Sequence, residues 1–205
     1  MNVDELWTGE FGNEYVSRNA NADTGRVATW KLLLSSLPRL PESVLEVGAN
    51  IGLNLEAIGR LIDCELYASE PNDLAREELI QSELMPERNV TADFARKLRW
   101  PDEHVDLAIT CGLLIHIPRD ELVQSMKEIY RTSKRYIISG EYFAPHEEMI
   151  PYRGKPNALW RRDYGSIWMD NFPDLYCHAS VFAWKRQTGL DNITFWVFEK
   201  GYRPN

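Results

Sequence analysis

Four residues between positions 46 and 52 have the types and the spacing of a ligand-binding turn. They are Glu46, Gly48, Asn50 and Gly52. Glu46 lies near the end of a short apolar run, and the other three residues follow that run. Two glycines in such a turn keep the main-chain N–H groups accessible, so a ligand can approach the backbone closely. The pattern predicts a strand, a glycine turn and a helix that together bind a nucleotide-like ligand.

The glycine spacing separates the common nucleotide-binding turns. A dinucleotide-binding turn has the pattern G-x-G-x-x-G, but counted from Gly48 the second and third glycine positions hold Asn50 and Leu53. A phosphate-binding loop has a lysine directly after its last glycine, and no lysine follows Gly52. The pattern E-x-G-x-x-x-G after an apolar strand resembles instead the first motif of the Rossmann-like S-adenosylmethionine-dependent methyltransferases.

Two acidic positions further along the chain extend this resemblance. Glu70 ends a second apolar run, near the offset of about 20 residues at which an acid meets ribose hydroxyls in such folds. Asp93 and Phe94 follow a third run, and the resemblance implies that this acid and this ring bind adenine. The predicted cofactor is S-adenosylmethionine, with S-adenosylhomocysteine as product. The residues predicted to bind it are Tyr15, Arg18, Glu46, Gly48, Asn50, Gly52, Glu70, Pro71, Asn72, Asp93, Phe94, Gly112 and Leu113.

The order of apolar runs predicts the elements that position these residues. Strand-like and helix-like patterns alternate, which is typical of a parallel sheet covered by helices on both faces. Two late runs predict an antiparallel hairpin at the sheet edge, so we expect an α/β, Rossmann-like class I methyltransferase fold with a mostly parallel seven-stranded sheet. The predicted strands are 44–48, 65–70, 89–92, 105–110, 136–140, 179–185 and 193–198, and the predicted helices are 27–37, 53–62, 73–84 and 120–132.

One segment interrupts the alternation. Residues 143–178 combine several prolines and glycines with arginines and aromatic residues. Long irregular segments in compact domains are usually functional or disordered, and the aromatic content opposes disorder. We therefore expect one domain over 1–205 with four parts: a helical N-terminal cap (1–40), a cofactor-binding core (43–142), a substrate cap (143–178) and a C-terminal hairpin (179–205).

Motifs outside the core resemble a particular family. They are WTGEFGNEYVSRN at 7–19, GEYF at 140–143, IPYRGK at 150–155 and WRRDY at 160–164. Together they are similar to the pseudaminic acid biosynthesis-associated methylases over nearly the whole chain. The resemblance implies that Tyr15 and Arg18 close over the methionine end of the cofactor. It also implies a small, anionic, sugar-like acceptor from a nonulosonic acid or nucleotide-sugar pathway.

Three residues near the carboxyl edge of the sheet are candidates for catalysis: His116, Glu141 and Tyr142. His116 could serve as a base for an oxygen or nitrogen acceptor, or it could be a packing residue. Glu141 could grip the acceptor or accept hydrogen bonds from backbone N–H groups. Methyl transfer itself needs mainly positioning and exclusion of water, without a metal ion.

Arginines in the predicted cap are candidates for binding the acceptor. Arg153, Arg161 and Arg162 could hold a carboxylate or phosphate in bidentate fashion, beside the ring of Tyr152. Ordinary surface charge is the alternative. Other function classes also stay open: a methyltransferase that modifies a peptide or other natural product, or a non-catalytic protein that binds S-adenosylmethionine or S-adenosylhomocysteine.

Composition narrows the classes further. The 205 residues include 23 basic and 31 acidic side chains, and the net charge of −8 opposes binding to nucleic acid. The three cysteines are too scattered for a disulfide framework or a paired zinc site, although Cys177 and His178 adjoin. No signal peptide or membrane span is evident, since the longest apolar run covers only 107–115. We expect a cytoplasmic protein that binds a small molecule and no metal; the oligomeric state stays open.

Overall fold

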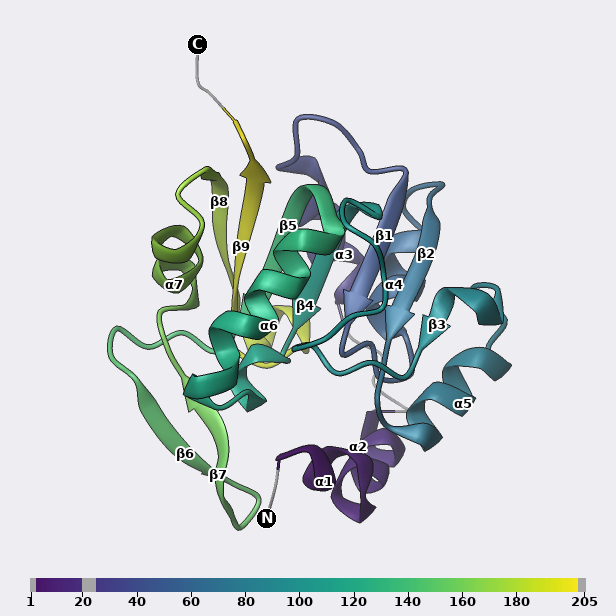
Figure 1. Ribbon diagram of the computed structural model, residues 1–205, viewed down its shortest axis with the longest axis vertical. Helices are drawn as coiled ribbons and strands as arrows, with labels where there is room; N and C mark the ends of the chain where they lie inside the picture. The colour runs from purple at the N-terminus through teal and green to yellow at the C-terminus, as the bar shows by residue number, and fades with distance from the viewer. Residues whose placement is uncertain (1–2, 20–24, 203–205) are drawn as a thin grey trace.

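A computed structural model describes residues 3–19 and 25–202 (Figure 1). One seven-stranded sheet organises the fold, in the order β3-β2-β1-β4-β5-β9-β8. Its first five strands in this order pair in parallel, and β9 pairs antiparallel with both β5 and β8. This confirms the predicted Rossmann-like class I methyltransferase fold. The strands are β1 (Ser43–Val47), β2 (Glu65–Ser69), β3 (Val90–Thr91), β4 (Val105–Cys111), β5 (Ser133–Glu141), β8 (Leu175–Ala183) and β9 (Ile193–Lys200).

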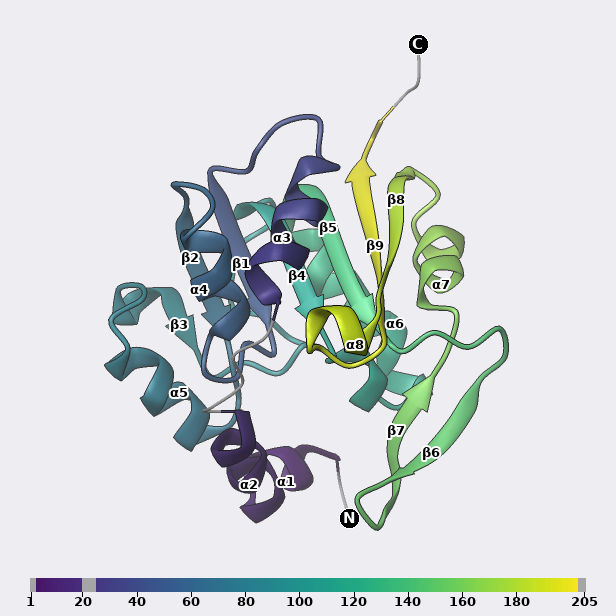
Figure 2. The ribbon, with the colours of Figure 1, turned by 180° about the vertical axis from the view of Figure 1, so that it is seen from behind.

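Helices cover both faces of this sheet (Figures 1 and 2). On one face, the apolar stripe of Leu122, Met126 and Ile129 packs α6 into a core that also holds Trp168 of α7. On the other face, Trp30 of α3 and Leu55 of α4 belong to a second core. The helices of the core are α3 (Arg26–Ser35), α4 (Leu53–Gly59), α5 (Asp73–Gln81), α6 (Arg119–Thr132), α7 (Tyr164–Asn171) and α8 (Lys185–Thr188).

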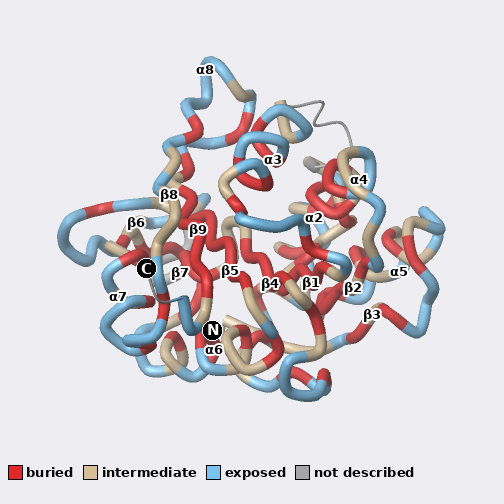
Figure 3. Tube along the Cα trace, turned by 90° about the horizontal axis from the view of Figure 1, so that it is seen from above, coloured by how far each residue is buried: buried red, intermediate tan, exposed pale blue. Residues whose placement is uncertain are grey.

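The central strands lie between these two cores. Four of the five residues of β1 are buried, as is typical of a parallel strand covered on both faces. Figure 3 shows the same burial along β4, β5 and β9. Because the parallel strands all end at one edge, the polar residues that follow them meet there.

Most predicted elements are present, with ends that shift by a few residues. The predicted helix 73–84 ends at Gln81, because Glu83 adopts a left-handed backbone conformation (φ 55°). The predicted strand 179–185 begins at Leu175, and Lys185 starts the short helix α8 instead of ending a strand. The 3-10 helices η1 (Glu87–Asn89) and η2 (Leu114–His116) were not predicted.

The description of residues 143–178 as irregular is wrong. This segment contains a second sheet of two strands, β6 (Glu148–Tyr152) and β7 (Lys155–Arg161), followed by α7 and the start of β8. A two-residue turn joins β6 and β7, and both Arg153 and Gly154 have positive φ there. The hairpin stands apart from the main sheet, whereas α7 and β8 belong to the core (Figure 1).

Two short helices precede the core, α1 (Val3–Thr8) and α2 (Glu10–Asn19). They lie beyond the carboxyl ends of β1, β2 and β4, at the same end of the molecule as the β6–β7 hairpin (Figures 1 and 2). Trp7 contacts the rings of Phe11 and Tyr15, each with centroids 5.5 Å apart. Their four-residue spacing therefore reflects an aromatic cluster shared between two helices.

No described helix is long and apolar enough to cross a membrane. Across 3–19 and 25–202, no three histidine, cysteine or acidic side chains are placed so that they could hold a metal ion. His178 contacts Glu199 through Nε2 at 2.7 Å, and Cys177 donates to the carbonyl of Ala179.

Candidate cofactor and acceptor site

A cleft of about 400 Å³ opens at the carboxyl edge of the sheet. This volume suits a small organic ligand. One side, called here the sheet wall, consists of residues 46–54, 70–72, 93–96 and 111–118, which follow β1, β2, β3 and β4. The opposing side, the cap wall, consists of α1, α2 and the β6–β7 hairpin. Both walls contribute lining residues, and residues 189–193 between α8 and β9 complete the cleft.

The predicted glycine turn shapes the sheet wall. Gly48 (φ 75°), Asn50 (φ 51°) and Gly52 (φ 80°) all adopt left-handed conformations, which glycine and asparagine tolerate best. A Cβ on Gly48 would lie 2.8 Å from Cδ1 of Leu113, so any other residue would have to displace the Leu113 side chain and adopt a strained backbone conformation. Gly52 does not line the cleft. It directly precedes α4, which begins at Leu53, and it faces Leu79, which corrects its prediction as a cofactor contact.

Glu46 places a carboxylate at the floor of the cleft. Its Oε1 accepts a hydrogen bond from Nδ2 of Asn54 at 2.7 Å, whereas its buried Oε2 has no partner among the described residues. Burial raises the pKa of Glu46 to about 8, although the Asn54 hydrogen bond and the charge of Arg26 oppose this shift. A buried acceptor without a donor is unfavourable, so this oxygen is suited to bind a cationic group of a ligand.

Arg18 offers the complementary group from α2. Its Nε and Nη2 atoms are buried and have no partner among the described residues, while Nη1 lies 3.5 Å from Glu14. The Nε and Nη2 edge of a guanidinium carries the two parallel N–H groups that match a carboxylate. The guanidinium also lies over the rings of Phe11 and Tyr15, at 5.9 and 5.5 Å from their centroids, which hold it in place.

Glu70 directly follows β2, which ends at Ser69, and lines the cleft. Its Oε2 accepts from the N–H of Asn50 at 2.7 Å and its Oε1 accepts from the N–H of Asn72 at 2.8 Å. Burial raises the pKa of Glu70, and these two hydrogen bonds oppose the shift. Each oxygen keeps a lone pair after these contacts, so the carboxylate can still accept from ligand hydroxyl groups.

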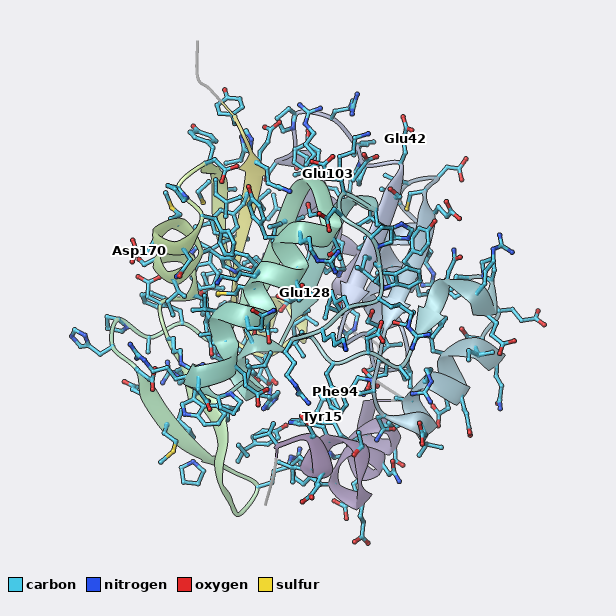
Figure 4. All side chains as sticks on the ribbon, in the orientation of Figure 1. Tyr15, Glu42, Phe94, Glu103, Glu128 and Asp170 are labelled. Carbon is cyan, nitrogen blue, oxygen red and sulfur yellow. The ribbon has the colours of Figure 1, made fainter. Side chains whose placement is uncertain are left out.

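Asp93 and Phe94 lie on the cleft beyond β3. Asp93 accepts from the N–H and Nε of Arg99, at 3.0 and 3.1 Å, and remains largely covered. Phe94 lies under the guanidinium of Arg96, and in the view of Figure 4 its label stands above that of Tyr15. The predicted residues Tyr15, Arg18, Glu46, Gly48, Asn50, Glu70, Pro71, Asn72, Asp93, Phe94, Gly112 and Leu113 all line the one cleft.

His116 belongs to η2 and also lines the cleft. Its Nδ1 lies 2.6 Å from the carbonyl oxygen of Ala158 in β7. Because a carbonyl only accepts, Nδ1 carries the proton and Nε2 keeps its lone pair. Burial lowers the pKa of His116 to about 4, so the ring is neutral at physiological pH. Its ring centroid lies 4.3 Å from that of Trp7 and 5.3 Å from that of Tyr152.

Tyr142 reaches the cleft from the end of β5. Its hydroxyl donates to Oδ2 of Asp191 at 2.7 Å, and Lys185 holds the other oxygen of this carboxylate at 2.9 Å. Burial and the Asp191 carboxylate both raise the pKa of Tyr142, so the phenol stays protonated. Tyr152 and the exposed Arg153 line the facing side, on the hairpin.

Glu141 corrects one prediction about catalysis. It is fully buried and does not line the cleft. Its carboxylate accepts from the hydroxyl of Thr110 at 2.9 Å and from the N–H of Ile115 at 3.2 Å. The side chain therefore holds the loop after β4 in place, which is the structural alternative for this residue.

Arg161 and Arg162 correct a second prediction, because neither lines the cleft. Arg161 is partly exposed and contacts Glu148 and the carbonyl of Phe143. Arg162 is 2% exposed and donates to Glu147 at 3.0 Å and to the carbonyl of Ile117 at 3.0 Å. It fastens the hairpin to the core, so of the three arginines predicted to bind the acceptor only Arg153 reaches the cleft.

Several cleft residues were not predicted from the sequence. Asn54 holds Glu46 while its Oδ1 accepts from Arg26 and from Trp30, at 2.9 and 3.1 Å. Asp191 comes from the connection between α8 and β9, and Arg96 from the loop after β3. For Asn54 the position in the first turn of the helix after the glycines was an available signal, whereas Asp191 is brought to the site by contacts distant in sequence.

Comparisons with known proteins bear on the class of the chain. Residues 45–136 match a protein family described as a methyltransferase domain. No curated protein matches the chain in sequence. The matched stretch begins within β1 and extends into β5, so it contains the glycine turn, Glu70 and the Asp93–Phe94 pair. The match covers less than half of the chain, and it supports the prediction of a methyltransferase.

Solved structures share the fold at low identity. One is the 1,6-didemethyltoxoflavin-N1-methyltransferase of Burkholderia thailandensis, bound to 1,6-didemethyltoxoflavin and S-adenosylhomocysteine (14% identity, 97% of this chain, 86% of the other, TM-score 0.71). Another is the magnesium protoporphyrin IX methyltransferase of Synechocystis PCC 6803 with S-adenosylmethionine (13%, 98% of each chain, TM-score 0.67). A third is the [4+2]-cyclase SpnF (10%, 86% and 81%, TM-score 0.64). Because one fold hosts several chemistries, the acceptor has to be argued from the site.

Proposed function

We propose that the cleft binds S-adenosylmethionine and that the chain transfers its methyl group to a small, anionic, sugar-like acceptor. The observation that carries the proposal is a pair of unmet polar groups on one cleft: Oε2 of Glu46, and the Nε and Nη2 atoms of Arg18. An amino acid has an ammonium group for the first and a carboxylate for the second. This pairing distinguishes an adenosyl amino acid from a dinucleotide, which has neither group.

The remaining parts of the cofactor follow from the order of residues along the sheet wall. Glu70 would accept hydrogen bonds from the ribose hydroxyls, and Asp93 with Phe94 would hold adenine. The cofactor supplies an activated methyl group on a sulfonium. The role of the protein is to hold the acceptor in line and to exclude water, which can account for much of the acceleration.

The acceptor would lie between His116, Tyr142 and the hairpin residues Tyr152 and Arg153. Neutral His116 offers the Nε2 lone pair to an acceptor hydroxyl or amine, and Arg153 offers its guanidinium to an anionic group. Aromatic rings can pack against the apolar face of a sugar. The resemblance to the pseudaminic acid biosynthesis-associated methylases supports a nonulosonic acid or a nucleotide-linked sugar as the acceptor.

Incubation with S-adenosylmethionine labelled in the methyl group tests this proposal. We expect label to move to nonulosonic acids or nucleotide-linked sugars, and to move less to their uncharged analogues. The variant Arg153→Gln should raise KM for the anionic acceptor and leave turnover of an uncharged acceptor unchanged. Binding of the cofactor without transfer to any anionic sugar would reject the acceptor class and keep the cofactor assignment.

A further inference from the structure

Arg96 lines the cleft, yet neither the sequence motifs nor the proposed reaction gives it a role. It follows Phe94 by two residues in the loop between β3 and β4. Its guanidinium carbon lies over the Phe94 ring, 4.7 Å from the centroid. At this distance the cation and the ring attract each other, so the position of one restrains the other.

The same guanidinium reaches the N-terminal helices. Its Nη1 donates to Oδ1 of Asp4 at 2.8 Å, and its Nη2 donates to the other oxygen of that carboxylate. Asp4 belongs to α1 and also lines the cleft. Two parallel hydrogen bonds between a planar fork and a carboxylate fix orientation as well as distance. Nη1 is also 3.3 Å from Glu121 of α6, so one side chain joins three parts of the molecule.

A second polar tie lies near this end of the cleft. Nδ2 of Asn72 donates to the carbonyl of Trp7 at 2.8 Å and to Oδ1 of Asn13 at 2.9 Å. The backbone N–H of Asn72 binds Glu70, the residue proposed to hold ribose. Both ties therefore run from the N-terminal helices to residues directly beside the proposed adenosine site.

We propose that Arg96 is a positioning residue that couples docking of α1 and α2 over the cleft to occupation of the adenosine end. This inference rests on the proposed function, because it takes Phe94 as the ring against which adenine packs. A ligand that fixes Phe94 also fixes the guanidinium above it, and the oriented guanidinium holds Asp4. By linkage, docked helices must strengthen nucleoside binding by the same factor as nucleoside binding stabilises the docked helices.

The experiment measures both sides of this coupling on the full chain. Hydrogen exchange of residues 3–19 is recorded with and without adenosine and S-adenosylhomocysteine, and calorimetry gives the affinity of each ligand. The variants are Arg96→Lys, which keeps the charge but removes the planar fork, and Asp4→Asn, which alters the partner on α1. The control is Glu56→Gln, which removes the exposed ion pair with Arg60 away from the cleft.

In the native chain we expect both ligands to slow exchange in 3–19. In Arg96→Lys and in Asp4→Asn this protection should largely disappear, and affinity for both ligands should fall about three- to tenfold. The double variant should lose no more than about the larger single effect, because both changes break one contact. Glu56→Gln should behave like the native chain.

Two results overturn the coupling. If Arg96→Lys and Asp4→Asn lower the melting temperature while affinity and protection stay native, Arg96 is only structural. If the native chain binds S-adenosylhomocysteine without any change of hydrogen exchange in residues 3–19, docking of α1 and α2 is not coupled to the ligand. The proposed function stands after either of these two results. Failure of the native chain to bind either ligand would instead remove the proposed function and this inference together.

Discussion

On the sheet wall the backbone holds the cleft in shape, whereas on the cap wall side chains do so. In the turn at 48–52 three residues have left-handed backbone conformations. The backbone N–H groups of Asn50 in this turn and of Asn72 after β2 both donate to the Glu70 carboxylate, which ties the two segments together. The cap wall is held by contacts such as Trp7 with His116, Asp4 with Arg96, and Arg162 with Glu147. In our proposal the sheet wall binds S-adenosylmethionine, which is the same in every reaction. The cap wall, which side-chain contacts hold, selects the acceptor.

Replacing one glycine on each wall should give the largest difference in cofactor affinity between the sheet wall and the cap wall. Gly48→Ala places a methyl group 2.8 Å from Leu113 in a left-handed turn, so cofactor affinity should fall at least about thirtyfold. Gly154→Ala is the matched control, because its φ is similarly positive but nothing lies within 4 Å of the added Cβ. Calorimetry with S-adenosylhomocysteine gives both affinities. Similar losses in the two variants would show that backbone strain, not close approach, controls the turn.

The arginines of the hairpin provide a test of stability rather than binding. Arg162→Ala removes the buried donor to the Ile117 carbonyl and to Glu147, which keeps its contact with Arg119, and should cost about 2 kcal/mol in the free energy of unfolding. Arg161→Ala removes an exposed ion pair and should change it by less than about 0.5 kcal/mol. Urea unfolding measures both. Equal stability of the two variants would contradict the role of Arg162 as the fastening of the hairpin.

Glu46 should make cofactor binding depend on pH. Its pKa of about 8 in the ligand-free protein means that it is mostly protonated at pH 6, and a bound ammonium group favours its ionised form. Affinity for S-adenosylhomocysteine should therefore rise from pH 6 to pH 7.5. Glu46→Gln should remove this dependence and lower affinity at pH 7.5 about ten- to a hundredfold, because a charged hydrogen bond is lost.

The same residue makes an opposite prediction for stability. The folded-state pKa of Glu46 lies above its unfolded value of 4.5, so the folded state binds more protons between pH 4.5 and 8. This contribution to stability is present below pH 4.5 and is lost as the pH rises through 8. At pH 9 the Glu46→Gln variant should therefore melt at a higher temperature than the native chain without ligand. A lower melting temperature would show that Glu46 is stabilised in its charged form without a ligand.

A smaller loss of cofactor affinity is expected from a substitution where the cap wall meets the sheet wall. A Cβ on Gly12 would lie 1.9 Å from the Trp7 carbonyl and 2.7 Å from Nδ2 of Asn72, so Gly12→Ala should displace α1 and α2. Affinity for S-adenosylhomocysteine should fall by about three- to tenfold, while the core unfolds as before. Gly59→Ala, with an ordinary contact of 3.5 Å to Leu66, is the control. Native affinity in Gly12→Ala would mean that the N-terminal helices do not contribute to cofactor binding.

The two walls also differ in how far the sequence predicts them. The sheet wall follows from short motifs, because strand, turn and helix succeed one another within about ten residues and the parallel strands share one edge. Arg161 and Arg162 adjoin in sequence but have different partners, and Arg162 is buried where it meets the Ile117 carbonyl, 45 positions away. The hairpin was missed although Arg153-Gly154 is a suitable turn, because prolines and glycines in the flanking sequence indicated irregular structure. Asp191 meets Tyr142 across 49 positions, and no local pattern could reveal that contact.

In our proposal, Glu46 and Arg18 together bind the amino acid part of an adenosyl ligand. Calorimetric titration of S-adenosylhomocysteine and of adenosine into the native chain, Glu46→Gln and Arg18→Gln measures this contribution. We predict one site per chain, tighter binding of S-adenosylhomocysteine than of adenosine, and a loss of that preference in both variants while adenosine affinity stays native. Equal affinity of the native chain for the two ligands, or no binding of either, would contradict the account.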